Sequence, residues 1–467
     1  MPPDFYFPPA FSETLRQLPI ADEEREDFVR AHQQTPPVSL RLNKGKPSTR
    51  FADDERVAWC SQGRYLPMRP RFTSDPLLHA GAYYVQEASS MLLCHIVQQV
   101  CDLSSPLTVL DACAAPGGKS TLLINLLNEQ SLLLANEMVR QRSQVLAENL
   151  IKWGNPYTFV TCNAPEQFAA LKGMFDLLVI DAPCSGEGLF RKDETAHKQW
   201  SPELVRHCAI RQEKILNSLA PTLAPQGILL YSTCTYEPAE NEAQIMRLLE
   251  TGDFESIEID MPIEWGITTK IGTLPNGMRW YAYQCYPHRV KGEGFFVSIL
   301  KRLTQNCHET KRRTPKSNAN TTKKLSEQQK KTILTYLHPD IVQKYILFEE
   351  KEEIFALPKV IWETWNALHG HLYFLKQGIL MGKWNGKELL PSPELALSTA
   401  LNPNLPCVDL DKNQALAFLQ KHDICLPEST PTGWLLAKHE QHALGWLKNL
   451  GNRSNNYYPK EWKIMKA

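Results

Sequence analysis

Two cysteines in polar segments have the residue type and surroundings needed for nucleophilic chemistry. Cys184 lies in DAPCSGEG (181–188), and Cys234 lies in STCTYEPAENE (232–242). Most of the twelve cysteines of the chain are expected to be small buried hydrophobic residues. A thiol beside a polar loop can instead be activated as a thiolate. Two such thiols in Gly-, Ser- and Thr-rich segments are therefore candidates for reactive cysteines.

A third segment, DACAAPGGKS (111–120), has small residues that let a ligand approach the main chain closely. It matches neither GxGxxG nor GxxxxGK[ST], so it is neither the usual dinucleotide fingerprint nor a Walker A loop. Glu137 ends the next apolar run, where a carboxylate can accept hydrogen bonds from ribose hydroxyls. A nucleoside without a pyrophosphate fits this pattern. The alternative is a glycine turn needed only for helix–strand packing.

Alternating apolar runs and amphipathic stretches predict the elements that position these side chains. Continuous apolar strands separated by helices indicate a parallel sheet covered on both faces. Because ligands bind at the carboxyl ends of such strands, we expect Asp181, Cys184 and Cys234 to share one edge. The predicted strands are 107–113, 131–137, 157–163, 175–184 and 227–236, and the predicted helices are 120–130, 138–154 and 202–220.

The net charge of zero, from 51 basic and 51 acidic residues, conceals an uneven distribution. Residues 303–467 carry 22 Lys and Arg against 16 Asp and Glu, and residues 1–302 carry 29 against 35. The segment 311–331 alone has eight basic residues and one acidic residue. It is either a solubilising linker or an arm that contacts phosphates. A zero total therefore does not exclude a nucleic-acid partner.

Several classes of protein are not expected. The first residues show no basic stretch followed by an apolar one, so no signal peptide is predicted. No apolar run approaches the roughly 18 residues that a membrane span needs. No two cysteines are spaced as CxxC, which argues against a metal site and against a disulfide framework. We expect a cytoplasmic protein, monomeric by default, that binds neither membrane nor metal.

Taken together, DACAAPGGKS, Glu137, DAPCSGEG and STCTYEPAENE resemble the S-adenosylmethionine-dependent RNA cytosine-C5 methyltransferases, the NOL1/NOP2/sun group. SLRLN (39–43) resembles the N-terminal signature of that group, and YYVQEASSML (83–92) resembles the segment before its cofactor domain. The likeness extends from about residue 39 to 300. The remainder more weakly resembles the bacterial 16S rRNA m5C methyltransferases that carry a C-terminal PUA-type RNA-binding module.

The resemblance implies a Rossmann-like α/β methyltransferase domain with an N-terminal α+β extension and a C-terminal α+β region containing a PUA-like module. It divides the chain into an N-terminal RNA-binding extension (1–103), a catalytic domain (104–302), a basic linker (303–331) and a C-terminal RNA-binding region (332–467). On this division, removing residues 311–467 is expected to weaken RNA binding more than cofactor binding.

The implied reaction transfers a methyl group from S-adenosyl-L-methionine to C5 of cytosine 1407 in 16S rRNA, within the 30S subunit. Cytosine C5 is a poor nucleophile, and addition of a thiolate at C6 activates it. Alternatives are a tRNA or another rRNA position, or a non-catalytic RNA-binding assembly factor. The intact pair of Cys184 and Cys234 argues against the last alternative.

The resemblance also implies roles for individual residues. Cys234 is expected to attack the base, Cys184 to release the product, and Asp181 to bind the cytosine and lie near the methionine part of the cofactor. Glu137 is expected to bind the ribose. Asn163 stands where the group often has Asp beside the adenine amino group. Lys119 either contacts the substrate or caps the loop. The cofactor loop is Cys113, Ala114, Ala115, Pro116, Gly117, Gly118 and Lys119.

RNA is expected to be held outside the pocket by phosphate contacts and base stacking, after the target base has left its stack. The basic residues predicted for this are Arg41, Arg191, Lys192 and the 311–331 segment. The predicted stacking residues are Tyr83, Tyr84, Trp200, Trp280 and Tyr286, each with core packing as its alternative.

Overall fold

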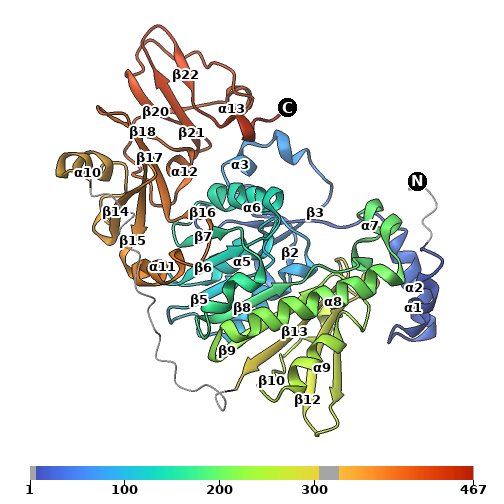
Figure 1. Ribbon diagram of the computed structural model, residues 1–467. Helices are drawn as coiled ribbons and strands as arrows, with labels where there is room; N and C mark the ends of the chain where they lie inside the picture. Colours follow the sequence, from blue (N-terminus) through green and yellow to red (C-terminus); the bar gives the residue numbers. More distant parts are fainter. Residues whose placement is uncertain (1–6, 304–324, 466–467) are drawn as a thin grey trace.

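The computed structural model describes residues 7–303 and 325–465 of the chain, and a ten-stranded sheet runs through its centre (Figure 1). The strand order is β11-β12-β13-β9-β8-β5-β6-β7-β16, with β10 paired to β13. The five central strands are parallel, as predicted. They are β9 (Leu223–Thr233), β8 (Phe175–Asp181), β5 (Thr108–Asp111), β6 (Leu132–Asn136) and β7 (Thr158–Thr161).

Apolar residues point to both faces of these strands, which explains their unbroken apolar sequences. Leu110 and Leu134 pack with helices α8 (Pro202–Leu219), α9 (Glu242–Glu250) and α11 (Trp362–His369). Val109 and Leu133, their neighbours in sequence, pack with α4 (Leu93–Val100) and α5 (Gly118–Leu126) on the other face. Helix α6 (Arg140–Trp153) covers Ala135 and Val160. The sheet is therefore covered on both faces, as expected of a parallel sheet.

One end of the sheet is extended by antiparallel strands. β13 (Phe295–Arg302) pairs with β9, and β12 (Arg279–Cys285) and β11 (Thr268–Thr273) follow it outward. The short strand β10 (Phe254–Ser256) also pairs with β13. These antiparallel strands complete the part of the chain expected to be catalytic.

The N-terminal part contains two helices and a small sheet. Helices α1 (Phe11–Gln17) and α2 (Asp22–His32) pack through Phe11 and Phe28 on the region of α7 (Glu194–Gln199) and α8 (Figure 1). The sheet has the order β2-β3-β1-β4. Its elements are β1 (Val38–Leu42), β2 (Arg56–Val57), β3 (Cys60–Leu66), β4 (Tyr83–Val85) and the intervening helix α3 (Pro76–His79).

The C-terminal part forms two four-stranded sheets, β14-β15-β17-β18 and β19-β20-β21-β22. The first contains β14 (Tyr345–Glu350), β15 (Glu353–Pro358), β17 (Ile379–Trp384) and β18 (Leu389–Pro391). The second contains β19 (Cys407–Asp409), β20 (Gly433–His439), β21 (His442–Asn449) and β22 (Ser454–Asn456). Helices α10 (Glu327–Leu334), α12 (Pro393–Leu397) and α13 (Lys412–Leu419) accompany them.

The predicted division of the chain at residue 332 is crossed by one strand. β16 (Phe374–Gln377) pairs antiparallel with β7 and forms the last strand of the central sheet. Phe348 and Trp365 lie in the same apolar cluster as Phe159 and Leu178 of the central strands. The four ranges remain a prediction, but the C-terminal range is not a separately packed unit, because its apolar residues complete the core of the methyltransferase part.

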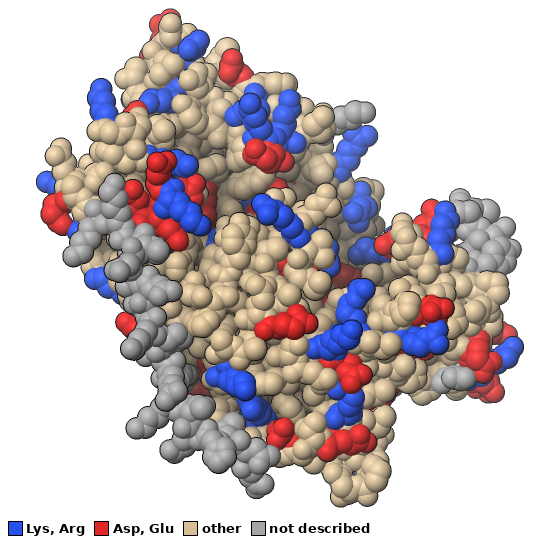
Figure 2. All heavy atoms as spheres, in the orientation of Figure 1, with Lys and Arg blue, Asp and Glu red and all other residues tan. Residues whose placement is uncertain are grey.

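Basic and acidic side chains are interspersed over the face of the molecule shown in Figure 2. Most of the basic segment 311–331 lies outside the described residues. Although the two halves of the sequence differ in net charge, the described residues on this face form no separate basic and acidic regions.

Candidate active site

The two predicted cysteines meet at the carboxyl edge of the parallel strands. Cys184 follows β8 and Cys234 follows β9, and their Sγ atoms are 2.9 Å apart. The backbone amide of Cys234 also donates to Sγ of Cys184 at 3.3 Å. The hydrogen bond with Cys234 and burial together raise the pKa of Cys184 well above its ordinary value. Cys184 therefore keeps its proton at neutral pH and can donate it to the sulfur of Cys234.

An ion pair joins the cofactor loop to the same edge. Nζ of Lys119 lies 2.6 Å from Oδ2 of Asp181, and Oγ of Ser232 donates to Oδ1 of Asp181 at 2.8 Å. Burial alone would lower the pKa of Lys119, but the charge and hydrogen bond of Asp181 outweigh it and raise that pKa. Cys234 also contributes to this rise, which places the lysine charge within electrostatic reach of the sulfur.

A buried hydrogen-bond network supports the loop that carries Cys184. The backbone amide of Ser185 donates to Glu240, and the Ser185 hydroxyl bonds both Glu240 and Glu187. Nε2 of Gln212 on α8 donates to Glu240 at 2.7 Å and to the carbonyl of Pro183 at 3.0 Å. Burial, and then the charge of Glu187, raise the pKa of Glu240 to about 8. The loop is thus held by two acids that resist ionisation.

The loop between β5 and α5 combines a glycine that close packing against α6 requires with a buried carboxyl group that can serve a ligand. Gly117 has φ of 114°, and a Cβ placed there would lie 3.3 Å from Cδ1 of Leu146. Asp111 is fully buried, with Oδ2 accepting from Ser120 at 2.6 Å, and among the described residues Oδ1 has no hydrogen-bond partner. Burial raises the pKa of Asp111 to about 7. An unpartnered buried acceptor beneath a glycine loop fits a ligand that brings a donor.

Glu137 lies at the end of the next strand, β6, and is also buried. Its Oε1 accepts from the amide of Val139 at 2.9 Å, and its Oε2 lies 3.1 Å from Arg142. The guanidinium of Arg142 donates in turn to the carbonyl of Ala115 in the cofactor loop at 3.0 Å. These contacts fix the carboxylate beside the loop, where it can accept from ribose hydroxyls.

Asn163 follows β7 and is 2% exposed. Its side-chain Oδ1 accepts from the backbone amide of Tyr373, a residue of the C-terminal region, at 3.0 Å. Because the strands lie side by side in the order β8-β5-β6-β7, the side chains at their ends follow one another along this edge as Asp181, Asp111, Glu137 and Asn163. Together with the cofactor loop, this edge offers acceptors for a nucleoside beside a pair of thiols.

Three family models match consecutive parts of the chain. The model for the 16S rRNA methyltransferases RsmB/F matches residues 99–301. The model for the N-terminal domain of 16S rRNA methyltransferase RsmF matches residues 7–88, and the model for the RsmF PUA domain matches residues 405–464.

Whole proteins of this kind align over nearly the entire chain. Ribosomal RNA small subunit methyltransferase F of Serratia proteamaculans is 30% identical over 483 residues, covering 98% of this chain and 96% of that protein. Its namesake from Aeromonas salmonicida is 29% identical over 474 residues, covering 98% and 97%. The chain belongs to the RsmF family. It is therefore a methyltransferase, as predicted.

Solved structures agree with the RsmF assignment at the level of fold. A methyltransferase homolog from Pyrococcus horikoshii has a TM-score of 0.51 at 27% identity, covering 63% of this chain and 94% of its own. NSun6 from the same organism, solved with SFG, has a TM-score of 0.51 at 18% identity, covering 64% and 98%. The predicted methyltransferase fold and the PUA module are confirmed.

Two arginines that we expected to contact RNA have structural roles in this RsmF chain. Arg41 is 1% exposed and bonds Gln86 and Thr121, where it joins the N-terminal sheet to α5. Arg191 is buried against Glu293 at 2.8 Å. The predicted RNA contacts of both residues were wrong, because their guanidinium groups bond acceptors inside the protein that are distant in sequence. Lys192 is exposed and remains a predicted RNA contact.

Three of the predicted stacking residues belong to the core instead. Tyr83, Trp200 and Tyr286 are buried, and Tyr286 stacks on Tyr236 with ring centroids 5.6 Å apart. Their predicted contact with RNA bases is therefore wrong. Tyr84 and Trp280 are partly buried, and both pack against the apolar clusters of the sheet.

Sequence reasoning missed the residues that orient the predicted ones. Asp111 and Ser120 lie within the segment recognised as the cofactor loop, and Ser232 begins the segment that carries Cys234. Their position inside these motifs was the available signal. Glu240 also lies in a recognised segment, but its burial under Cys184 depends on α8, which no local pattern reveals.

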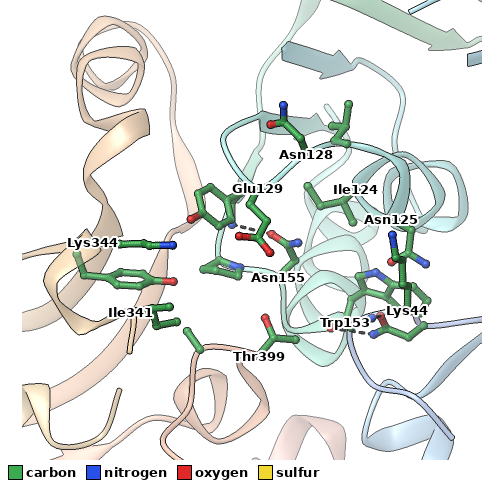
Figure 3. A pocket seen from close by; sticks show the side chains of 17 residues that line it. Lys44, Ile124, Asn125, Asn128, Glu129, Trp153, Asn155, Ile341, Lys344 and Thr399 are labelled. Carbon is green, nitrogen blue, oxygen red and sulfur yellow. Dashed lines mark hydrogen bonds between the residues drawn. The ribbon is translucent and has the colours of Figure 1, made fainter. Parts of the chain in front are cut away.

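A separate cavity of about 380 Å³ lies at the opposite, amino edge of β6 and β7 (Figure 3). Lys44, Glu129, Asn155 and Lys344 line it, and these residues come from the N-terminal, central and C-terminal parts of the chain. Because the two cysteines follow the carboxyl ends of their strands, this cavity is distinct from the active site.

Within residues 7–303 and 325–465, no helix is long and apolar enough to cross a membrane. Over the same residues, no group of three or more His, Cys, Asp or Glu side chains is arranged to hold a metal ion.

Proposed function

We propose that this RsmF-family chain methylates C5 of a cytosine in 16S rRNA through a covalent bond between Cys234 and the base. The observation that carries the proposal is the 2.9 Å contact between two thiols beside the Lys119–Asp181 ion pair. S-adenosylmethionine is the cofactor and, when bound, supplies the methyl group. Asp111, Glu137 and the loop between β5 and α5 would hold it, because the two buried carboxyl groups at the strand ends offer acceptors.

Cys234 acts first in the proposed reaction. Its thiolate sulfur forms a bond to C6, and the electron pair of the C5–C6 double bond moves so that C5 becomes nucleophilic. Once C5 carries the methyl group, a base removes the C5 proton, the S–C6 bond breaks and the double bond returns. We assign to Cys184 the donation of its thiol proton to the departing sulfur of Cys234, against which it lies, while a separate base takes the C5 proton.

Asp181 and Lys119 prepare the base for attack. Ser232 and Lys119 each hold one carboxylate oxygen of Asp181, so its direction is set before the substrate arrives. Such preorganised polar groups act most strongly in a site that excludes water. We assign Asp181 to a hydrogen bond with the cytosine, and Lys119 to holding Asp181 and stabilising negative charge near Cys234.

The proposed target is cytosine 1407, presented within the 30S subunit to a monomeric enzyme in the cytoplasm. The names of the RsmF relatives and the matching PUA model support a small-subunit rRNA substrate. We propose that residues 1–103 and 332–467 bind RNA around the catalytic range 104–302, with the basic linker 303–331 between them.

Methylation of isolated 30S subunits and of naked 16S rRNA tests this function. RNA from a deletion strain is incubated with enzyme and S-adenosylmethionine, and m5C is mapped by bisulfite sequencing. We expect one new m5C, at position 1407, from the wild type and none from Cys234→Ala. Buried Cys208→Ala is the matched thiol control. Methylation only of tRNA or only at another rRNA position would contradict the proposed target, and full activity of Cys234→Ala would contradict the mechanism.

A further inference from the structure

The end of β7 is connected to the C-terminal region through Asn163. Its Oδ1 accepts from the amide of Tyr373 at 3.0 Å, and the amide of Cys162 donates to the carbonyl of Tyr373 at 3.1 Å. Because a backbone N–H is a donor only, this contact fixes which end of the carboxamide is oxygen. The nitrogen Nδ2 is therefore directed away from Tyr373. Among the described residues, no hydrogen bond uses Nδ2.

Asn163 is also connected to the cofactor loop through Asn136, the last residue of β6. The amide of Asn163 donates to Oδ1 of Asn136 at 3.1 Å, and Nδ2 of Asn136 donates to the carbonyl of Asn163 at 3.0 Å. Asn136 further bonds the carbonyl of Ala112 and the amide of Ala114. A continuous set of hydrogen bonds thus runs from Tyr373 to the start of the cofactor loop.

Apolar packing follows the same path. Leu375 in β16 packs against the buried cluster that contains Ala114 and Ala115 of the cofactor loop, and Leu146 of α6. The backbone pairing of β16 with β7 holds Leu375 in that position. The C-terminal region therefore supports both the strand end and the loop that form one side of the nucleoside site.

The position of the base follows from the position of the ribose. Glu137 at the end of β6 is the expected ribose acceptor, and the next strand end is that of β7, where Asn163 lies. An adenine amino group is a donor and requires an acceptor, which an Asp would offer. The Nδ2 of Asn163 is a donor and matches instead a ring nitrogen of adenine.

We propose that the C-terminal region completes the adenine end of the cofactor pocket, and that Asn163, positioned by Tyr373, donates a hydrogen bond from Nδ2 to an adenine ring nitrogen. The inference rests on S-adenosylmethionine as the cofactor. Under this proposal, cofactor recognition depends on Tyr373, which lies 210 positions after Asn163 in the sequence.

Binding of S-adenosylhomocysteine without RNA, measured by calorimetry, tests the donor role. In Asn163→Asp the carboxylate still accepts from Tyr373 but cannot donate, so we expect Kd to rise roughly tenfold. Asn155→Asp is the matched control, because Oδ1 of Asn155 also accepts a backbone amide, that of Tyr157, before the same strand begins. We expect its Kd to equal that of the wild type.

Deaza analogues test the same contact without altering the chain. S-adenosylhomocysteine lacking N1, N3 or N7 is titrated into the wild type and into Asn163→Asp. We expect the wild type to bind one of the analogues roughly five- to tenfold more weakly than S-adenosylhomocysteine. Asn163→Asp should bind that analogue and S-adenosylhomocysteine with equal affinity. If the wild type bound all three analogues as tightly as S-adenosylhomocysteine itself, the donor role would be overturned. Wild-type affinity in a folded Asn163→Asp would do the same, whereas no binding of S-adenosylhomocysteine to any chain would overturn the cofactor assignment itself.

Discussion

At the scale of single residues, Lys119 has the most consequential contacts at the catalytic edge. It belongs to the cofactor loop by sequence, yet its Nζ lies 2.6 Å from Asp181, at the end of another strand. Burial disfavours its charge, but Asp181 and Asp111 keep the pKa raised. Lys119 is the more buried partner of the pair, so its charge would be costly without Asp181. The sequence left open whether Lys119 contacts the substrate or caps the loop; the structure shows it paired with Asp181.

Replacing Lys119 with methionine should slow methyl transfer more than it weakens cofactor binding. The substitution removes a charge-assisted hydrogen bond to Asp181, an interaction of about 2 to 3 kcal/mol, so the single-turnover rate should fall roughly 30- to 150-fold. The rate is measured by transfer of labelled methyl groups to 16S rRNA. Lys172→Met, at an exposed site, is the control. A wild-type rate in Lys119→Met would show that the pair with Asp181 is not needed for the reaction.

Residue type and the position after an apolar run predicted which side chains meet at the strand ends better than they predicted the RNA contacts. Cys184, Cys234 and Asp181 were predicted because each lies in a polar segment directly after an apolar run. Arg41 and Arg191 were assigned to RNA on their charge, but their hydrogen-bond partners lie 45 to 160 positions away in the sequence. The sequence shows which residues are charged. Only the fold shows whether the charged group already bonds a buried acceptor and is therefore unavailable to RNA.

At the scale of elements, the loops after β8 and β9 act as one unit. Ser185 from the first loop bonds Glu240 from the segment after β9, and Thr235 lies 3.2 Å from the Ser185 hydroxyl. Glu187 and Glu240 are both buried, and burial is the largest cause of the raised pKa of each; the charge of Glu187 raises the pKa of Glu240 further. The position of the Cys184 loop beside Cys234 therefore depends on acids that favour the protonated form.

The stability of this unit should decrease as pH rises. The pKa of Glu240 is about 8 in the folded chain against an ordinary value of 4.5, so its favourable contribution is complete below about 4.5 and is lost as pH rises through 8. The midpoint of thermal unfolding should therefore fall between pH 6 and pH 9, and Glu240→Gln should flatten that fall. Glu203→Gln, exposed on α8, is the control. An identical slope in Glu240→Gln and the wild type would contradict this account.

The central strands were predictable because each is buried on both faces and reads as an unbroken apolar run. β16 was not predicted as part of that sheet. Its sequence, FLKQ, carries only two apolar residues, and its partner β7 lies about 200 positions earlier in the chain. Buried Lys376 is accommodated there by the carbonyls of Thr158 and Gly378 and by Glu394, an arrangement that no local pattern indicates.

At the scale of the whole molecule, the C-terminal region is part of the methyltransferase rather than an appendage to it. β16 forms an edge strand of the central sheet, and Phe348, Trp365 and Leu368 complete the core beneath Phe159. Removal of residues 311–467 would expose this core and the unpaired edge of β7. We now expect such a truncation to lose cofactor binding together with RNA binding, in place of the selective loss that the sequence suggested.

A single core substitution tests this shared packing without truncation. Trp365 is 3% exposed and donates to Gln377 in β16, so Trp365→Ala should lower the free energy of unfolding by about 3 to 5 kcal/mol. Hydrogen exchange followed by mass spectrometry should show faster exchange in peptides of β7 as well as in those of the C-terminal region. Trp384→Ala, in β17 outside this cluster, is the control. Faster exchange confined to residues 325–465 would contradict the shared core.

The central claim is that Cys234 forms the bond to the base and Cys184 releases it. The most direct measurement is to incubate Cys184→Ala with 30S subunits or 16S rRNA and S-adenosylmethionine, separate the products on a denaturing gel and identify the modified peptide by mass spectrometry. The account predicts a slowly migrating protein–RNA adduct with methylcytidine attached at Cys234, absent from the Cys184→Ala/Cys234→Ala double variant. Attachment at another cysteine, or the absence of any adduct, would contradict it.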